Sequence, residues 1–207
     1  VSQIYRQKND FAKAREASRK ALEIDPENLE ARFNDVNLFE AEGKIAEALT
    51  LLKDMLGSTR KSSYSTGEKA NRVALLERLG VMYRSNEQPQ EAVAAFREIG
   101  ELDATLSPRV AAQVIETYRA AKEYAKAERE AEEAAKKHPD DRTLRMVRAS
   151  VLAETGKPAQ AVEELKTLLD GKSDREIQLS IAQAHEKAKN YPEMAKALDA
   201  AEKLSES

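Results

Sequence analysis

The sequence contains no cysteine and no tryptophan, and it has only seven glycines and six prolines among 207 residues. The absence of cysteine excludes a disulfide framework, a thiol nucleophile and every zinc or iron–sulfur site that depends on cysteine ligands. Aromatic residues make up only 5% of the chain, whereas charged residues make up 34%. So few glycines, prolines and aromatic residues argue against a β-sandwich or barrel and favour helices.

Strongly basic segments and long apolar segments are also missing. The net charge is −3, and no third of the chain carries the excess of Lys and Arg that binding to a phosphate backbone requires. No apolar run approaches the roughly 20 residues of a membrane span, and no basic-then-apolar leader opens the chain. We therefore expect no nucleic-acid partner and no membrane insertion. The sequence favours no particular cellular compartment. Because the first residue is Val1, we expect a processed product or a fragment of a longer protein.

Short phrases that end on a small alanine recur along the chain, such as DFAKA at 10–14 and EYAKA at 123–127. Five of these phrases end at Ala14, Ala48, Ala92, Ala127 and Ala161. The successive spacings are 34, 44, 35 and 34 residues, so the second spacing indicates about ten inserted residues. We expect the small alanine to lie where two helices cross most closely, because a larger side chain there would force them apart.

Apolar residues inside each unit follow a helical period, and prolines such as Pro89 stand where a first helical turn needs no N–H donor. The best copy of the pattern is formed by Leu76, Leu79, Gly80, Tyr83, Ala92 and Phe96. In these residues the chain resembles the tetratricopeptide repeat (TPR) family. The resemblance implies an all-α fold, a right-handed α-solenoid of antiparallel helix hairpins (a TPR-like superhelix), whose first helices line a concave groove.

The spacing also predicts the organisation of the chain. We expect 1–207 to form a single TPR-like solenoid, with a partial unit at 1–28 and full units at 29–62, 73–106, 108–141, 142–174 and 175–207. Residues 63–72 fit no repeat unit, and we interpret them as an insertion between two units. The segment around it is rich in Ser, Thr and Gly, so we expect a flexible loop.

No catalytic motif is visible in the sequence. The only histidines are His138, in an inter-unit turn, and His185, at a position equivalent to the packed Tyr83 and Tyr118. The chain has no H-E-x-x-H, G-x-S-x-G, Walker or G-x-G-x-x-G pattern. The acidic run at 128–133 alternates with other residues and indicates a solvated, salt-bridged helix face. We therefore expect no enzyme activity, no catalytic residue, no cofactor and no metal site.

Residues that the repeat does not explain are candidates for binding. Eight of the ten aromatic residues fill repeat positions, and the two exceptions are Phe33 on a first helix and Tyr64 in the insertion. Asn amides can pair with a peptide backbone, and Arg offers a two-pronged fork to carboxylates. The groove candidates are Phe33, Asn34, Asn37, Arg78, Arg84, Arg109, Gln113 and Arg119. Two simpler interpretations stay open: Phe33 packs against a neighbouring helix, and the insertion with Tyr64 is a tolerated surface loop.

The TPR resemblance implies a protein–protein interaction scaffold that binds a peptide or partner helix in its concave groove. The alternative is a structural or oligomerisation module of a larger enzyme or of a secretion or assembly complex. The last helix carries an apolar stripe that no later helix covers. As an oligomerisation module, the chain would associate with a second copy through this stripe. The stripe consists of Met194, Leu198, Ala201 and Leu204.

Two more specific interpretations receive little support. A clamp for the acidic tail of a heat-shock chaperone would match only Asn34 and Arg78 of its five positions. A pentatricopeptide-type RNA reader shares the helical-hairpin layout, but the sequence lacks the basic surface that such a protein needs.

Overall fold

The computed structural model describes residues 2–8, 10–171 and 174–204. Within these ranges the chain forms twelve α-helices and one short 3-10 helix, joined by turns and loops, with no strand. The prediction of an all-α architecture is confirmed. The chain divides into two compact units, Val1–Asp103 and Ala104–Ser207, and each is described by itself.

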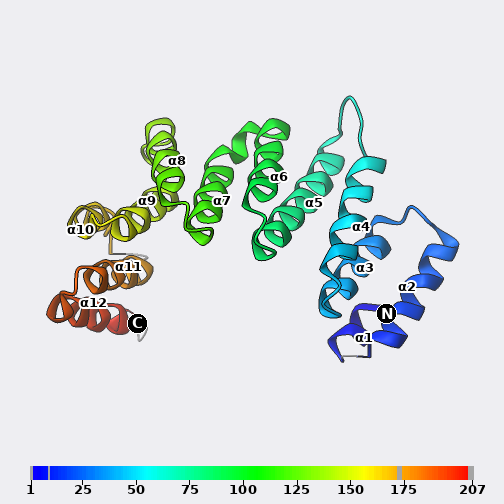
Figure 1. Ribbon diagram of the computed structural model, residues 1–207, viewed down its shortest axis with the longest axis horizontal. Coiled ribbons are helices and arrows are strands. Elements are labelled where there is room, and N and C mark those ends of the chain that lie inside the picture. The colour runs from blue at the N-terminus through cyan, green and yellow to red at the C-terminus, as the bar shows by residue number, and fades with distance from the viewer. Residues whose placement is uncertain (1, 9, 172–173, 205–207) are drawn as a thin grey trace. The chain divides into compact units, whose positions relative to one another are not determined.

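The first unit contains three hairpins, each formed by two helices that follow one another in the chain (Figure 1). They are α1 (Ser2–Gln7) with α2 (Phe11–Ile24), α3 (Leu29–Ala41) with α4 (Ile45–Ser58), and α5 (Thr66–Ser85) with α6 (Pro89–Leu102). Neighbouring hairpins are joined because α2 packs against α3 and α4 packs against α5.

The second unit begins with the 3-10 helix η1 (Ala104–Leu106) and contains three more hairpins (Figure 1). They are α7 (Ser107–Ala120) with α8 (Tyr124–Lys137), α9 (Arg142–Glu154) with α10 (Pro158–Lys166), and α11 (Asp174–Lys187) with α12 (Tyr191–Lys203). Here the first helices also pack directly against each other, α7 against α9 and α9 against α11.

Local sequence signals explain where the helices begin. Asp10, Asn28 and Asp141 are N-cap residues whose side-chain oxygens accept a hydrogen bond from the backbone N–H three residues later, at 3.2, 3.0 and 2.8 Å. A proline stands in the first turn of α6, α7, α10 and α12, where its missing N–H leaves no helical bond unmade.

The recurring small alanine is buried in each unit where the sequence identifies it. Ala14, Ala48, Ala92, Ala127 and Ala161 are all fully buried. In the third hairpin, α5 and α6 approach so closely that a Cβ atom on Gly80 would lie only 2.6 Å from Cε1 of Phe96. The absence of a side chain at Gly80 therefore allows α5 and α6 to pack at short range.

The predicted flexible loop at 63–72 is wrong over its second part, because α5 begins at Thr66 and 66–72 are helical. The reason is a capping box, in which the Ser65 side chain accepts a hydrogen bond from the Glu68 N–H (3.3 Å) while the Glu68 carboxylate accepts one from the Ser65 N–H (2.8 Å). The connection between α4 and α5 is 59–65. The division of 1–207 into repeat units of one solenoid stays a prediction, and Val1 and 205–207 lie outside the described residues.

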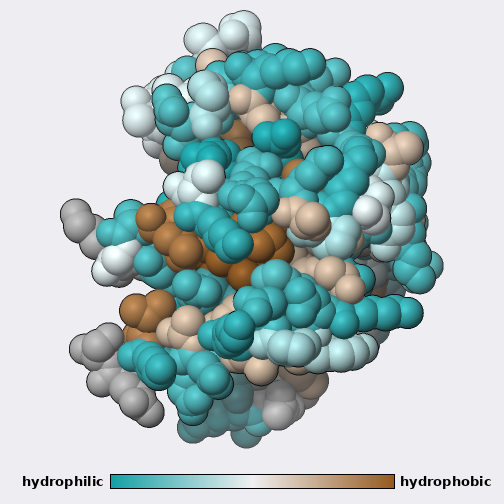
Figure 2. Space-filling view, turned by 90° about the vertical axis from the view of Figure 1, so that its left-hand side faces the viewer, coloured by the Kyte–Doolittle hydropathy of each residue, from teal (hydrophilic) through white to brown (hydrophobic). Residues whose placement is uncertain are grey.

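The apolar stripe predicted for the last helix is split by the fold. Met194 packs against a buried cluster that α9–α12 share, and Ala201 is buried as well. Leu198 and Leu204 keep 42% and 39% of their surface exposed. Figure 2 views the side of the chain that carries α10 and α12, where hydrophobic side chains gather between hydrophilic ones. None of the described helices combines the length and the apolar character needed to cross a bilayer.

Candidate functional site

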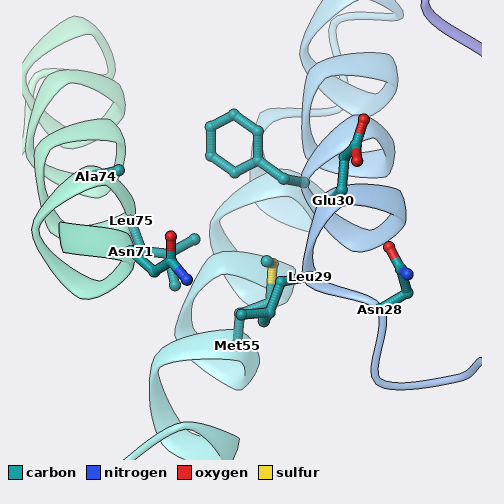
Figure 3. Close-up of a pocket in the computed structure, with 8 residues that line it drawn as sticks. Asn28, Leu29, Glu30, Met55, Asn71, Ala74 and Leu75 are labelled. Atoms are coloured by element: carbon teal, nitrogen blue, oxygen red, sulfur yellow. The ribbon is translucent and has the colours of Figure 1, made fainter. Parts of the chain in front are cut away.

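A pocket with a volume of about 470 Å³ lies between α3 and α5 in the first unit. Its apolar wall comes from Leu29, Phe33, Met55, Ala74 and Leu75. Figure 3 shows that α3, α4 and α5 all contribute, with Met55 on the α4 side and Asn71, Ala74 and Leu75 on α5. The remaining lining is polar and consists of Asn28, Glu30 and Asn71. A mostly apolar cavity of this size with a few polar groups is typical of a ligand-binding site.

The pocket lies beside the first turns of α5, and Asn71 of the predicted insertion is part of its lining. In the second unit, first helices of neighbouring hairpins pack directly against each other, but α3 and α5 make few close backbone contacts. Residues 66–72 of the predicted insertion are helical and extend α5, which has 20 residues. The space between α3 and α5 is open, and Phe33 is part of its lining.

A second pocket of about 260 Å³ adjoins the first and contains Tyr64. The two pockets share Leu29, Asn71 and Leu75 in their walls. The second pocket also takes charged side chains, which are Glu27, Lys61, Glu68 and Arg72. The two aromatic residues that the repeat does not explain, Phe33 and Tyr64, thus lie in adjoining pockets.

Tyr64 is tied to the fold by its own neighbours. Its hydroxyl oxygen accepts a hydrogen bond from the Lys61 N–H at 3.0 Å, and the Arg72 guanidinium lies 5.5 Å from the centre of its ring. Lys61 in turn forms an ion pair with Glu68. The hydrogen bonds that Glu68 accepts from the Lys61 side chain and from Ser65 lower the pKa of this carboxyl to about 2. The loop therefore forms a defined wall of the second pocket.

Arg72 is the anchor that sequence reasoning missed. Its residue surface is only 6% exposed, which is rare for an arginine. The guanidinium donates to the Leu56 carbonyl at 2.8 Å and to the Glu98 carboxylate at 3.2 and 2.6 Å, so it joins α4, α5 and α6. The only available signal was an arginine at the end of a segment expected to be a loop. Nothing local indicates its partner, which lies 26 residues away.

The other groove candidates of the first unit are partly committed to internal contacts. Arg78 on α5 donates to Asn37 on α3 at 3.2 Å and forms an ion pair with Glu40 on α3. The Arg84 guanidinium lies 5.7 Å from the centre of the Phe96 ring. Asn34 is half-buried on α3, and the structure shows no partner for its amide. The structure thus brings Asn37 and Arg78 together, as a bridge between first helices.

The remaining candidates, Arg109, Gln113 and Arg119, lie on α7 in the second unit. Arg119 forms a two-pronged ion pair with Glu154 on α9, with both N···O distances at 2.8 Å, and it also pairs with Glu116. The hydrogen bonds from Arg119 lower the pKa of Glu154, and the same bonds raise the pKa of Arg119. Arg119 therefore joins α7 to α9, whereas Arg109 is exposed and Gln113 is half-buried.

One pair that the sequence did not reveal has chemically capable groups. Ser107 Oγ and His138 Nε2 are 3.3 Å apart, although the residues are separated by 31 positions. The contact joins the start of α7 to the end of α8. Among the described residues the ring of His138 has no carboxylate partner that would orient it, so the arrangement lacks the third member of a nucleophile–base–acid relay. The described part of the chain also holds no cluster of metal-ligating side chains.

Comparisons with known proteins agree with the observed architecture. Two models of the tetratricopeptide repeat family match the chain, one over residues 5–67 and the other over 115–176 and 149–207. A search by sequence found no match among curated proteins.

Solved structures provide the second comparison. A tetratricopeptide repeat protein from Parabacteroides merdae is 18% identical with a TM-score of 0.64, over 98% of this chain and 75% of that one. BtubC from P. vanneervenii is 12% identical with a TM-score of 0.63, over 98% and 91%. YrrB, a TPR protein with an unusual peptide-binding site, is 16% identical with a TM-score of 0.51, over 89% and 90%. These likenesses show an α-solenoid of helical hairpins. From the two family matches, the chain belongs to the tetratricopeptide repeat family, whose members act as scaffolds for protein–protein interaction.

Proposed function

We propose that this chain binds a peptide segment or partner helix between α3 and α5, with an apolar side chain of the partner seated beside Phe33. The observation that carries the proposal is the pocket of about 470 Å³ lined by Leu29, Phe33, Met55 and Leu75. Apolar anchors in such pockets provide most of the binding energy in protein interfaces. The description of YrrB as a TPR protein with a peptide-binding site supports this assignment by likeness of fold.

We assign the hydrogen bonds to the peptide backbone to asparagine side chains. Asn71 lines both pockets and Asn34 lies one residue after Phe33, and the structure shows no hydrogen-bond partner for either side chain. An Asn amide offers one acceptor and two donors, which matches the pattern of an extended peptide backbone. Arg78 and Arg119 are assigned a different task, because their ion pairs already join neighbouring first helices.

The test begins with a selection of random 12-residue peptides displayed on phage against the 207-residue chain. The enriched peptides are then synthesised with a fluorescent label and titrated by fluorescence anisotropy. Ala74→Trp places a large side chain at the pocket wall without removing a packed residue, since Ala74 is exposed. We expect Ala74→Trp and Phe33→Ala each to weaken binding about tenfold or more.

The matched control is Ala94→Trp, which adds the same side chain at an exposed alanine of α6, outside the pocket lining. It should bind the peptides like the unmodified chain. Equal binding by Ala74→Trp and Ala94→Trp, or a selection that enriches no peptide, would contradict the proposal.

An oligomerisation module is the second candidate function, and it rests on α12. Tyr191, Leu198 and Leu204 are 59%, 42% and 39% exposed on this helix or directly after it. Exposed large apolar side chains on one helix are a common feature of association surfaces. This candidate concerns a different unit from the pocket, so the two can be tested independently.

A further inference from the structure

The charged residues that line the two adjoining pockets differ in whether they have an oppositely charged partner within the chain. Five such residues are present: Glu27, Glu30, Lys61, Glu68 and Arg72. Four of them already have an oppositely charged partner within the chain, through the pairs Glu27–Arg32, Lys61–Glu68 and Arg72–Glu98. Glu30 is exposed, and the structure shows no ion pair or hydrogen bond for its carboxylate.

The position of Glu30 relative to the apolar wall is equally specific. Glu30 and Phe33 are three residues apart on α3, so their side chains lie next to each other on one face of the helix. Both line the same pocket, and Figure 3 shows Glu30 at its α3 side. The next acidic residue on this face, Glu40, is already neutralised by Arg78. Among the described residues that line the two pockets, Glu30 is therefore the charged side chain for which the structure shows no oppositely charged partner, and it lies next to the apolar wall.

We propose that the pocket between α3 and α5 selects a peptide in which a large apolar side chain stands beside a lysine or arginine, with the apolar side chain in the pocket and the cation on Glu30. This inference rests on the proposed function and adds the chemistry of the partner. An acidic peptide is disfavoured, because Lys61 and Arg72 cannot neutralise it without giving up Glu68 and Glu98. Asn71 on the opposite wall then faces the peptide backbone.

The phage selection tests this chemistry through the composition of the enriched peptides. We expect most enriched 12-residue peptides to carry Lys or Arg within four positions of a Leu, Met, Phe or Trp, well above the frequency in the unselected library. Glu30→Gln should weaken binding of these peptides by about two- to five-fold, as removal of an exposed ion pair does. The loss should shrink at 1 M salt, where charges on the surface are screened.

Reversing the charge at position 30 should change which peptides are selected, and not only how tightly they bind. A selection repeated on Glu30→Lys should enrich Asp or Glu beside the apolar residue. The matched control is Glu91→Lys, because Glu91 is also an exposed acidic residue in the first turn of its helix but lies on α6 outside the pocket lining. Glu91→Lys should enrich the same basic and apolar peptides as the unmodified chain.

The failures of the two proposals are distinguishable. If Ala74→Trp abolishes binding while Glu30→Gln and Glu30→Lys leave affinity and peptide composition unchanged, the groove stands and the basic partner is wrong. If the enriched peptides are acidic or uncharged, the basic partner is again wrong. If Ala74→Trp and Phe33→Ala bind like the unmodified chain, the groove itself is wrong and the charge preference falls with it.

Discussion

The guanidinium of Arg72 lies over the ring of Tyr64, 5.5 Å from its centre, and the same guanidinium binds Leu56 and Glu98. This relationship connects the loop 59–65 to the interior of the first unit. A cation over an aromatic ring contributes about 0.5–1 kcal/mol at a partly exposed site, and the hydrogen bonds add to this. The loop that forms one wall of the second pocket is thus held by a residue of α5.

Replacing Arg72 by alanine should destabilise the protein by about 2 kcal/mol. The change leaves the Leu56 carbonyl without its donor and Glu98 without its counter-charge, while solvent at the partly exposed Glu98 moderates the loss. Thermal unfolding followed by circular dichroism should show a midpoint lower by roughly 4–8 °C. Arg60→Ala is the control, because Arg60 is exposed in the same connection and no side-chain partner is seen for it. Equal midpoints for the two variants would show that Arg72 does not anchor this region.

The sequence predicted the hairpins well because their determinants are local and repeat. The buried alanines, the prolines in first turns and the Asp and Asn caps all act within one helix or one hairpin. Even the start of α5 had a local signal, since Ser65 and Glu68 form the S-x-x-E pattern of a capping box. Because the surrounding segment is rich in Ser, Thr and Gly, its composition predicted a flexible loop where α5 begins.

The pocket could not be predicted in the same way. Its walls come from α3, α4 and α5, and its volume depends on how far apart α3 and α5 are held. Phe33 and Tyr64 could be singled out because they fit no repeat position, but their presence in adjoining pockets depends on the path of 59–65. The buried Arg72 is a case of the same kind, because its partner Glu98 is distant in sequence.

Gly80→Ala should destabilise the protein by about 1–3 kcal/mol, although alanine favours a helix by about 1 kcal/mol over glycine. The added methyl group would lie 2.6 Å from Cε1 of Phe96, a buried residue that has little room to move. Urea unfolding measures the change in the free energy of unfolding. The control is Gly57→Ala in α4, where a Cβ meets nothing within 4 Å, and this variant should be as stable as the parent or more so. Combining Gly80→Ala with Phe96→Leu should recover part of the loss, and a stable Gly80→Ala variant alone would refute the close crossing.

Ala127→Leu should also lower the free energy of unfolding by roughly 1–3 kcal/mol, since Ala127 is a fully buried residue of α8, which packs against α7. Ala125→Leu introduces the same side chain at an exposed position of α8 and should be nearly neutral. The comparison separates crowding between helices from any general effect of leucine on α8. Similar urea midpoints for both variants would mean that the recurring alanine is not required for the crossing.

Leu198 provides the test of self-association. If α12 is an association surface, light scattering during size-exclusion chromatography should give a mass that rises with protein concentration, and Leu198→Lys should remain monomeric at every concentration. Leu198 is 42% exposed, so the substitution should leave the fold intact. A monomeric parent chain over the whole concentration range would remove this candidate function and leave the groove between α3 and α5 unaffected.

The pair of Arg119 and Glu154 predicts a specific dependence of stability on pH. Hydrogen bonds from Arg119 lower the pKa of Glu154 in the folded state below its ordinary value of 4.5. The pair therefore stabilises the fold above pH 4.5, and the stabilisation is lost as pH falls, because the unfolded chain takes up the proton first. Both side chains are about one-fifth exposed, at 20% and 23%, so the contribution at neutral pH should be about 1 kcal/mol.

The measurement compares the parent with Glu154→Gln by urea unfolding between pH 3 and pH 8. Their difference in unfolding free energy should be constant above about pH 6 and should shrink as pH falls through 4.5. The other carboxylates titrate in both proteins and cancel in this difference. In an Arg119→Met background the same substitution should have a much smaller, nearly pH-independent effect, because the donor that lowers the pKa of Glu154 is gone. An unchanged pH profile in that background would assign the effect to charges other than Arg119.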